Sequence, residues 1–395
     1  MGLVFHFLRR GGTFSSHMKE CTGHQISASA LSQRRQALPW RLFELLLGHV
    51  LKPRAQEKKH PEAFWKGWRL CAIDGTQVSV QNTPQILSKM SKAVSRRFRA
   101  AFAKVQMSVV VEIGLHNPLG AIIGTRGESE MELGRRVLAS VPDGSLLIGD
   151  RYYGHGAFVD EFRRADPQNK RAFLLRVKSN LKARVVEVLA DGSALVEIES
   201  GEAKVIVREV RARVARKGRP TTEVRLWTSL LDATLYPARE LMETYAKRWE
   251  EEIFFKEFKI DVHPRGGTLL QSHTEETAAQ ELAAIFIAMA LLAERRMEAA
   301  AAGELPVLRI SLGKTLGYLE ALWQILSVGD GIISRPQSIA LIQAVIAQIA
   351  EACLPKRRQR NCVRAVRQPI RSYPRLVKPD SVKGPPVIEI TPIRK

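Results

Sequence analysis

Cysteine is scarce in this chain, and the cysteines form no pattern that indicates a zinc or disulfide site. The 395 residues include 4 cysteines, with no C-x-x-C pair among them. Structural zinc sites and disulfide frameworks both require closely spaced cysteines. Reduced thiols, either buried or incidental, are therefore expected.

Long apolar runs are also lacking. The longest strongly apolar run, residues 282–293, has 12 residues, whereas a membrane-spanning helix needs about 20. This run predicts a buried core helix. The first residues carry a brief apolar stretch followed by charge, without the pattern of a signal peptide. The expected location is the cytoplasm, and no membrane partner is predicted.

Acidic residues are outnumbered by basic ones. The sequence has 61 Lys and Arg against 40 Asp and Glu, which gives a formal charge of +21. Such a charge attracts polyanions, so nucleic acid is the expected partner. The alternative is a basic protein without this partner, because net charge also governs solubility. With 45% hydrophobic residues, the chain can bury a sizeable core.

The amino-terminal part of the chain is basic and partly helical in pattern. Residues 1–25 lack periodicity, and no structure is predicted for them; Met18 could equally serve as a start. Residues 26–65 follow a helical pattern, with Pro39 in a first turn. The apolar residues expected on one side of this helix are Leu38, Leu42, Leu45, Leu46 and Val50.

Strands and helices alternate in the middle of the chain, which predicts an α/β fold. Strands rich in β-branched residues are expected around Asp74 and up to residue 127, and a short apolar strand ends on Asp150. From residue 179 to 227, alternating apolar and polar residues predict an all-β insertion. From Tyr236 onward the pattern is helical again.

Two aspartates fall where a metal site is expected. Asp74 and Asp150 each end a predicted strand, which would place both at the carboxyl edge of a sheet, where ligands bind in many α/β folds. Phosphoryl transfer by two metal ions needs several carboxylates in one place, because such ions prefer oxygen ligands. Either residue alone also fits the alternative of a turn former or cap.

A third acid is indicated by helix geometry. Each residue turns an α-helix by about 100°, so residues offset by 0, 3, 7 and 14 positions fall at about 0°, 300°, 340° and 320°. One face of the helix around residue 249 therefore presents an acid, two bases and a phenol. They are Tyr245, Arg248, Glu252 and Lys259.

The same wheel separates Glu252 from its neighbours. Glu250 and Glu251 point at about 140° and 240°, and the core-facing Phe254 lies at about 180°. Glu252 is thus the acid favoured for chemistry. The alternative is a solvated helix face with an ion pair between Glu252 and Lys256, four residues apart.

The spacing Tyr245-x2-Arg248-x3-Glu252-x6-Lys259 resembles the YREK signature of the family-four insertion-sequence (IS-four) transposases, relatives of the DDE recombinases and retroviral integrases. The resemblance extends to AIDGT around Asp74, to the NTP of residues 82–84 and to LLIGDRYY at residues 146–153. Four blocks in the correct order are more specific than any one of them. The block after Asp150 departs from commoner versions in residues 152–154, which leaves that loop's DNA contacts open.

The resemblance implies an RNase H-like core, a mixed sheet interrupted by the all-β insertion and flanked by helical regions. Asp74, Asp150 and Glu252 would bind two Mg²⁺ or Mn²⁺ ions for cut-and-paste transposition. Double-stranded DNA would be the partner, as inverted repeats at the element's ends and as target, bound by a homodimer at the nucleoid. Tyr245, Arg248 and Lys259 match positions that contact phosphates in the family.

Five regions are then expected along the chain. They are a helical, DNA-binding region (1–65), the first part of the catalytic core (66–178), the β insertion (179–227), the second part of the core with the YREK helix (228–300) and a helical region with a basic tail (301–395).

Further DNA contacts are expected from a basic loop between residues 75 and 111, where six Lys or Arg occur without an acid. Arg96, Arg97 and Arg99 are its densest group; the alternative is a solvated loop. Trp227 could stack on a flipped base, but a buried core residue is the favoured interpretation. His155 is interpreted as a loop histidine, because two-metal sites need no general base.

Two alternative functions remain for the whole chain. One is a related RNase H-like nuclease, against which the YREK stripe and the β insertion argue. The other is an inactive or immobile DNA-binding remnant of a transposable element, against which the presence of all three acids argues.

The basic tail generates a testable prediction. Residues 356–378 carry nine Arg or Lys and no acid, which predicts an extended segment that binds DNA. Removing the tail after Pro355 is expected to weaken DNA binding and flatten its dependence on salt, because fewer phosphates are neutralised. Binding titrations at several salt concentrations measure this slope, and an unchanged slope would assign the tail another role.

Overall fold

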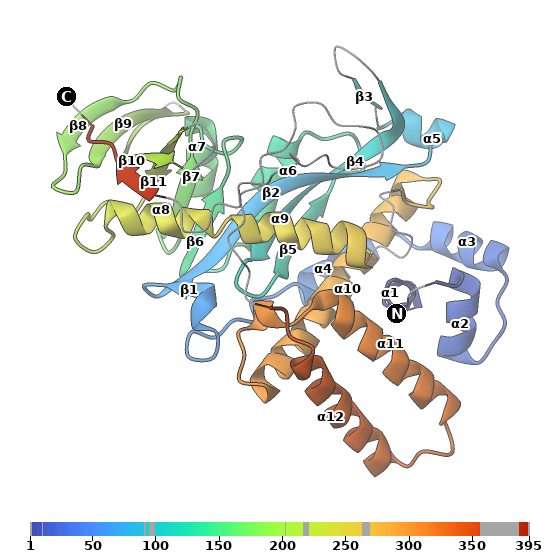
Figure 1. Cartoon of the computed structure of the whole chain (residues 1–395). Helices are drawn as coiled ribbons and strands as arrows, with labels where there is room; N and C mark the ends of the chain where they lie inside the picture. Colours follow the sequence, from blue (N-terminus) through green and yellow to red (C-terminus); the bar gives the residue numbers. More distant parts are fainter. Residues whose placement is uncertain are drawn as a thin grey trace, which may run out of the picture. The chain divides into compact units, whose positions relative to one another are not determined.

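The computed structural model describes residues 2–9, 11–90, 92–94, 99–201, 203–215, 221–262, 269–355 and 387–393 (Figure 1). The chain forms two compact units. The first unit comprises Met1–Leu146 and Arg248–Leu354, and the second comprises Leu147–Lys247 and Pro355–Lys395. Both mix strands and helices, so the predicted α/β class is confirmed.

An antiparallel sheet forms the centre of the first unit. Its long strands pair over ten registered positions, from Cys71 opposite Glu112 to Val80 opposite Ala103. The strands of this sheet are β1 (Phe64–Trp65), β2 (Trp68–Val80), β3 (Lys92–Val94), β4 (Arg99–Glu112) and β5 (Asn117–Ile123). β1 pairs with β2, while β3 and β5 pair with opposite ends of β4. The apolar residues of β2 from Leu70 to Ile73 and of β4 from Val109 to Val111 are completely buried, which explains why β-branched sequences form these strands.

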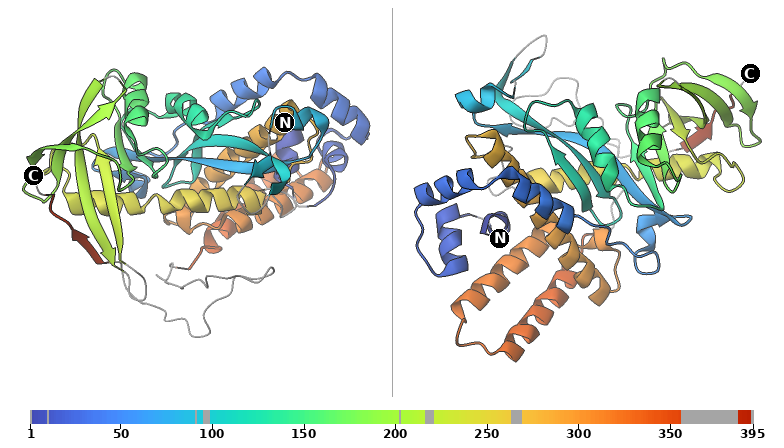
Figure 2. Two further views of the ribbon diagram at one scale, coloured as in Figure 1. Left: turned by 90° about the horizontal axis from the view of Figure 1, so that it is seen from above. Right: turned by 180° about the vertical axis from the view of Figure 1, so that it is seen from behind.

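Helices cover this sheet and complete the first unit (Figure 2). The α-helices are α1 (Gly2–Phe7), α2 (Phe14–Thr22), α3 (Ala28–Ala37), α4 (Trp40–Val50), α5 (Pro84–Leu87), α6 (Glu130–Val137), α9 (Trp249–Lys256), α10 (Glu275–Ala302), α11 (Leu312–Val328) and α12 (Arg335–Glu351). The π-helix η3 (Glu257–Val262) follows α9, and 3-10 turns occupy Pro61–Ala63, Leu138–Ser140 and Val307–Arg309.

The long helix α10 is the core element that the apolar run predicts. It begins at a Thr274 cap whose hydroxyl accepts a hydrogen bond from the Thr277 amide. Among the described residues it is the one helix long and apolar enough to cross a membrane, yet 89% of its most apolar window is buried inside the structure. α10 is therefore explained as the central helix of a protein core.

The amino-terminal residues, for which no structure is predicted, are helical. α1 buries Leu3, Val4 and Phe7, and the ring of Phe5 lies 4.5 Å from that of Trp323 in α11. α1 has 6 residues and α2 has 9, too few turns for a periodic pattern to appear in sequence. α1 packs against α10 and α11, and α2 packs against α1 and α3.

The predicted apolar side of α4 is wrong. Leu47 is its buried residue, whereas Leu42, Leu45 and Leu46 are 42%, 58% and 40% exposed. The predicted helical region also ends at Val50, and residues 51–60 form no helix or strand. α4 is apolar on most of its surface, so the sequence pattern alone does not select the buried side.

The second unit contains the β-rich part of the chain. Its elements are β6 (Ser145–Gly149, which starts in the first unit), α7 (Gly156–Ala165), β7 (Ala172–Arg176), β8 (Arg184–Val188), β9 (Ala194–Ser200), β10 (Ala203–Ala215), β11 (Thr222–Thr228), α8 (Ala238–Ala246) and β12 (Val387–Ile390). The strands from β7 onward lie in the order β7-β11-β10-β9-β8, with antiparallel pairing in this series.

The carboxyl-terminal part of the chain adds a strand to this second sheet. β12 pairs antiparallel with β10, from Ala212 opposite Ile390 to Ala215 opposite Val387. The basic residues 356–378 lie outside the described residues. A test of the tail by deletion would also remove β12, so replacing the Lys and Arg of residues 356–378 with Ser is the cleaner variant.

Trp227 is a core residue, as favoured from the sequence. It is 2% exposed, and its indole Nε1 donates a hydrogen bond to Glu209 Oε2 at 2.7 Å. The guanidinium of Arg225 lies 5.7 Å from the centre of the Trp227 ring and binds the same carboxylate. A ring enclosed in this way has no free face for a nucleotide base.

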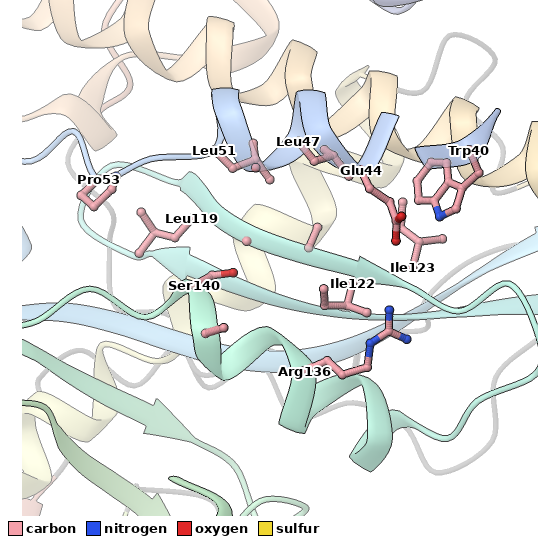
Figure 3. A pocket seen from close by; sticks show the side chains of 14 residues that line it. Trp40, Glu44, Leu47, Leu51, Pro53, Leu119, Ile122, Ile123, Arg136 and Ser140 are labelled. Carbon is pink, nitrogen blue, oxygen red and sulfur yellow. The ribbon is translucent and has the colours of Figure 1, made fainter. Parts of the chain in front are cut away.

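A cleft of about 390 Å³ lies between α4, β5 and α6 in the first unit (Figure 3). Leu47 of α4 and Leu51, the residue after α4, form one side, and Leu119 and Ile122 of β5 form another. None of the predicted site residues is among the described residues that line this cleft.

Candidate active site

Asp74 lies within β2, and this corrects the expectation that it ends a strand. β2 continues to Val80, and Asp74 is opposite Val109 of β4. The sequence after Asp74 keeps the alternating pattern of a strand, which is why pairing continues. Asp74 is partly exposed between the buried Ile73 and the half-buried Gly75, and its Oδ1 accepts a hydrogen bond from the Gly75 amide at 2.8 Å.

The two faces of β2 have different neighbours at this point. Side chains alternate between faces along a strand, and the Glu130 side chain of α6 lies directly over Gly75, where an added Cβ would be 2.4 Å from its Cγ. Asp74 therefore points to the opposite face. There it meets Arg248, with 3.8 Å between Asp74 Oδ2 and Arg248 NH1.

Arg248 connects Asp74 with Glu252. Its NH2 donates to Glu252 Oε1 at 2.7 Å, while its NH1 lies near Asp74. The side chains of Arg248, Asp74 and Glu252 are 17%, 24% and 39% exposed. We call these three residues the acid–arginine cluster. The alternative interpretation, an ion pair on the helix face, is therefore correct for Glu252. Its partner is Arg248, four residues earlier, in place of the predicted Lys256.

The three consecutive glutamates of α9 face different surroundings. Glu251 is completely buried, and Glu250 Oε2 lies 3.1 Å from His116 Nε2. Glu252 turns to the acid–arginine cluster. The helical wheel therefore separates the three glutamates correctly.

Lys259 lies in the π-helix η3, and the α-helical wheel does not hold there. A π-helix turns less per residue than an α-helix, so the angle of about 320° predicted for Lys259 assumes the wrong type of helix. π-helical turns are frequent at functional sites. Burial and the nearby charge of Lys104 lower the pKa of Lys259, while Asp74 acts in the opposite direction. Lys104 Nζ donates to Ser79 Oγ at 2.7 Å.

Lys259 thus brings positive charge close to Asp74, and Lys104 lies near Lys259. The sequence places Lys104 only in a general basic loop, and its position opposite Ser79 in the β2–β4 register gives the more specific location.

Asp150 follows β6 directly, as expected, and belongs to the second unit. Its Oδ1 accepts a hydrogen bond from the Tyr152 amide at 2.7 Å, which is the geometry of a turn-forming aspartate. Tyr245 also belongs to the second unit, near the end of α8. The single helix expected here is divided after Ala246 by two residues, Lys247 and Arg248, whose backbone remains in the α region.

The remaining predicted site residues carry no description of their side chains. Arg96 and Arg97 lie outside the described residues. Arg99 is the first residue of β4, and the structure does not describe its side chain. His155 caps α7, where its Nδ1 accepts a hydrogen bond from the Phe158 amide at 3.3 Å. This supports its interpretation as a structural loop histidine.

The acid–arginine cluster has the chemistry to attract a divalent cation. Carboxylate oxygens are the ligands that Mg²⁺ and Mn²⁺ prefer, and the two carboxylates here already share one positive group. Among the residues that the structure describes, no three His, Cys, Asp or Glu side chains gather closely enough to hold a metal ion by themselves. A cation at Asp74 and Glu252 would therefore compete with Arg248.

Comparison with known proteins gives matches among transposases. Residues 65–291 match the family model described as the transposase DDE domain. The transposase InsG for insertion sequence element IS4 of Escherichia coli (strain K12) is 26% identical over 274 residues, which cover 68% of this chain and 60% of InsG. InsZ of the same organism is 26% identical over 129 residues, 32% of this chain and 43% of InsZ. The matches thus span less than two thirds of either relative.

Among solved structures, the cryo-EM structure of the piggyBac transposase synaptic complex with hairpin DNA is similar with a TM-score of 0.44 and 11% identity, over 88% of this chain and 74% of that one. A likeness of this size carries no argument about this chain. The family model, by contrast, covers more than half of the sequence and includes Asp74, Asp150 and Glu252. Membership of this family implies dependence on a divalent metal in general. The chain therefore belongs to the family defined by the transposase DDE domain.

Proposed function

We propose that this protein is a transposase that cuts and rejoins DNA at the ends of an insertion sequence by metal-dependent phosphoryl transfer. The observation that carries the proposal is the acid–arginine cluster, which lies inside the stretch that matches the DDE domain. The formal charge of +21 supports DNA as the substrate, because a basic surface neutralises backbone phosphates. The names of the two relatives favour transposition over simple nuclease activity.

Asp74, Glu252 and Asp150 are the proposed ligands of two Mg²⁺ or Mn²⁺ ions in an RNase H-like core. Asp74 and Glu252 are supported by their common partner Arg248. Asp150 is supported by its position directly after β6 and by the sequence block around it. When bound, such ions activate the attacking oxygen and stabilise the leaving oxygen of the phosphodiester.

The role of Arg248 changes with the state of the site. Without metal, its guanidinium neutralises Asp74 and Glu252. If Asp74 and Glu252 held a divalent ion, the Arg248 guanidinium would be available to a phosphate of the DNA, for which its planar donors are well suited. Arg248 thus links ion binding to DNA binding.

The other basic groups act on the DNA backbone. Lys259 lies close to Asp74, with Lys104 near it, and a phosphate placed beside these two lysines would be attracted by their charge. Tyr245, Arg96, Arg97 and Arg99 are further proposed DNA contacts. The bound DNA is proposed to be the inverted repeats of the element and the target, held by a homodimer.

Each proposed metal ligand can be tested by replacing its carboxylate with the matching amide. Asp74→Asn, Asp150→Asn or Glu252→Gln should each leave DNA binding largely intact and abolish Mg²⁺-dependent nicking, because the amide is a poor ligand for these ions. Nicking of a duplex that carries the element's end is followed on a denaturing gel. Glu298→Gln, an exposed acid on α10 that pairs with Arg295, is the matched control. Cutting that survives any of the three changes removes that residue from the site.

Removing the competing guanidinium generates the second prediction. Arg248→Ala should strengthen Mn²⁺ binding in the absence of DNA by up to about fivefold, because a partly exposed ion pair contributes up to about 1 kcal/mol. Calorimetric titration of Mn²⁺ measures the change, and Arg295→Ala is the control for a lost surface arginine. Weaker or unchanged Mn²⁺ affinity would show that Arg248 does not compete with the ion.

A further inference from the structure

A second charged cluster lies on the other side of the helix that carries Glu252. His116, in the connection from β4 to β5, is 1% exposed. Its Nδ1 lies 2.7 Å from Glu257 Oε2, and its Nε2 lies 3.1 Å from Glu250 Oε2. Arg296 of α10 completes this cluster, which we call the histidine clamp.

Both ring nitrogens of His116 face carboxylate oxygens, so each must carry a hydrogen to form its bond. Burial lowers the pKa of His116, but Glu257 and Glu250 outweigh this effect and the pKa is raised. The result is an imidazolium held between two acids. It therefore acts as a rigid, two-ended connector from the β4–β5 connection to the helix.

Arg296 contacts the same oxygen of Glu257 that His116 does. It is 1% exposed, its NH1 lies 3.4 Å from Glu257 Oε2, and its Nε donates to the Ile310 carbonyl at 3.1 Å. The carboxylate of Glu257 is thus fixed between α10 and the β4–β5 connection.

The clamp grips the helix on the side away from the acid–arginine cluster. Glu250 and Glu252 are two residues apart, which corresponds to about 200° around an α-helix. The Phe254 ring packs edge-on to His116 at 6.5 Å between centroids, so the clamp lies on the core side. A rotation of α9 that moved Glu252 away from Asp74 would also pull Glu250 away from His116.

The position of the clamp along the helix is equally specific. Glu250 is in the first turn of α9, and Glu257 is the first residue of the π-helix η3. The clamp therefore spans the change from α to π geometry, two residues before Lys259. His116 itself has a positive φ of 51°, a conformation that costs free energy and persists where surrounding contacts determine it.

We propose that His116 is a positioning residue: bonded through both ring nitrogens to Glu250 and Glu257, it sets the rotation of α9 and η3 and so directs Glu252 and Lys259 toward Asp74. The proposal rests on the proposed function, because it assigns His116 to the same metal site. A cluster of apolar side chains could hold the helix against the core, but it would constrain this rotation less, since apolar packing is less directional than hydrogen bonding.

The test compares Mn²⁺ binding in full-length variants without DNA. His116→Asn keeps a residue that tolerates positive φ and removes the charge and one bond. It should weaken Mn²⁺ binding by about tenfold or more, the usual effect of losing a group that orients a metal ligand. Electron paramagnetic resonance of free Mn²⁺ gives the affinity. With DNA, the rate of nicking should fall while the dissociation constant for DNA stays the same.

The matched control is Glu281→Gln. Glu281 forms a similarly buried ion pair with Arg35, between α10 and α3 in the same unit, and it is not bonded to α9. This variant should lose stability and keep the wild-type Mn²⁺ affinity. Equal loss of Mn²⁺ affinity in both variants would mean that general destabilisation, and not positioning, explains the effect.

A second variant keeps the proposal testable if His116→Asn does not fold. Glu250→Gln preserves shape and removes one charge, and it should also weaken Mn²⁺ binding. Wild-type protein that does not bind Mn²⁺ would contradict the proposed metal site itself. If the wild type binds Mn²⁺ and the folded clamp variants bind it with the same affinity, the proposed role of His116 is wrong and the proposed metal site stands.

Discussion

The carboxylates of Asp74 and Glu252 share one cation, and the arrangement of the candidate site depends on this. Two acids that approach one partner repel each other unless positive charge lies near both, and Arg248 provides it through contacts of 3.8 and 2.7 Å. The sheet supplies Asp74 on a rigid strand, and α9 supplies Arg248 and Glu252 one turn apart. Carboxylates that attract a guanidinium also attract a divalent ion. This property links the acid–arginine cluster to the proposed phosphoryl transfer.

Helix α9 has two charged faces with different tasks. The acid–arginine cluster is partly exposed, as a group that meets ions and DNA must be, whereas His116 and Arg296 of the histidine clamp are each 1% exposed. Burying charged groups is costly unless they are paired, and the buried His116 and Arg296 both contact the carboxylate of Glu257. We propose that the histidine clamp fixes the rotation of α9 and therefore the direction in which Glu252 points. The π-helix η3 begins at the clamp residue Glu257 and carries Lys259.

The sequence predicts those parts of the fold and site that depend on local periodicity. The wheel distinguishes Glu252 from Glu250 and Glu251, and alternation locates β2, β4 and the strands from β9 to β11. Properties that arise from distant contacts are missed: the continuation of β2 past Asp74, the exposed leucines of α4, and the helices α1 and α2. The histidine clamp also escapes sequence analysis, because His116 and Glu250 are 134 positions apart and no local pattern connects them. The π-helix at Lys259 is also missed, because no local pattern distinguishes it from a continued α-helix.

The central claim is that divalent ions bind at Asp74 and Glu252 and displace Arg248 from between them. Anomalous diffraction from crystals grown with Mn²⁺ and DNA tests it most directly. The account predicts anomalous peaks about 2.1 Å from carboxylate oxygens of both residues, a usual distance for a small divalent ion, with the Arg248 guanidinium turned toward a phosphate. Peaks elsewhere, with Arg248 still bound to both acids, would contradict it.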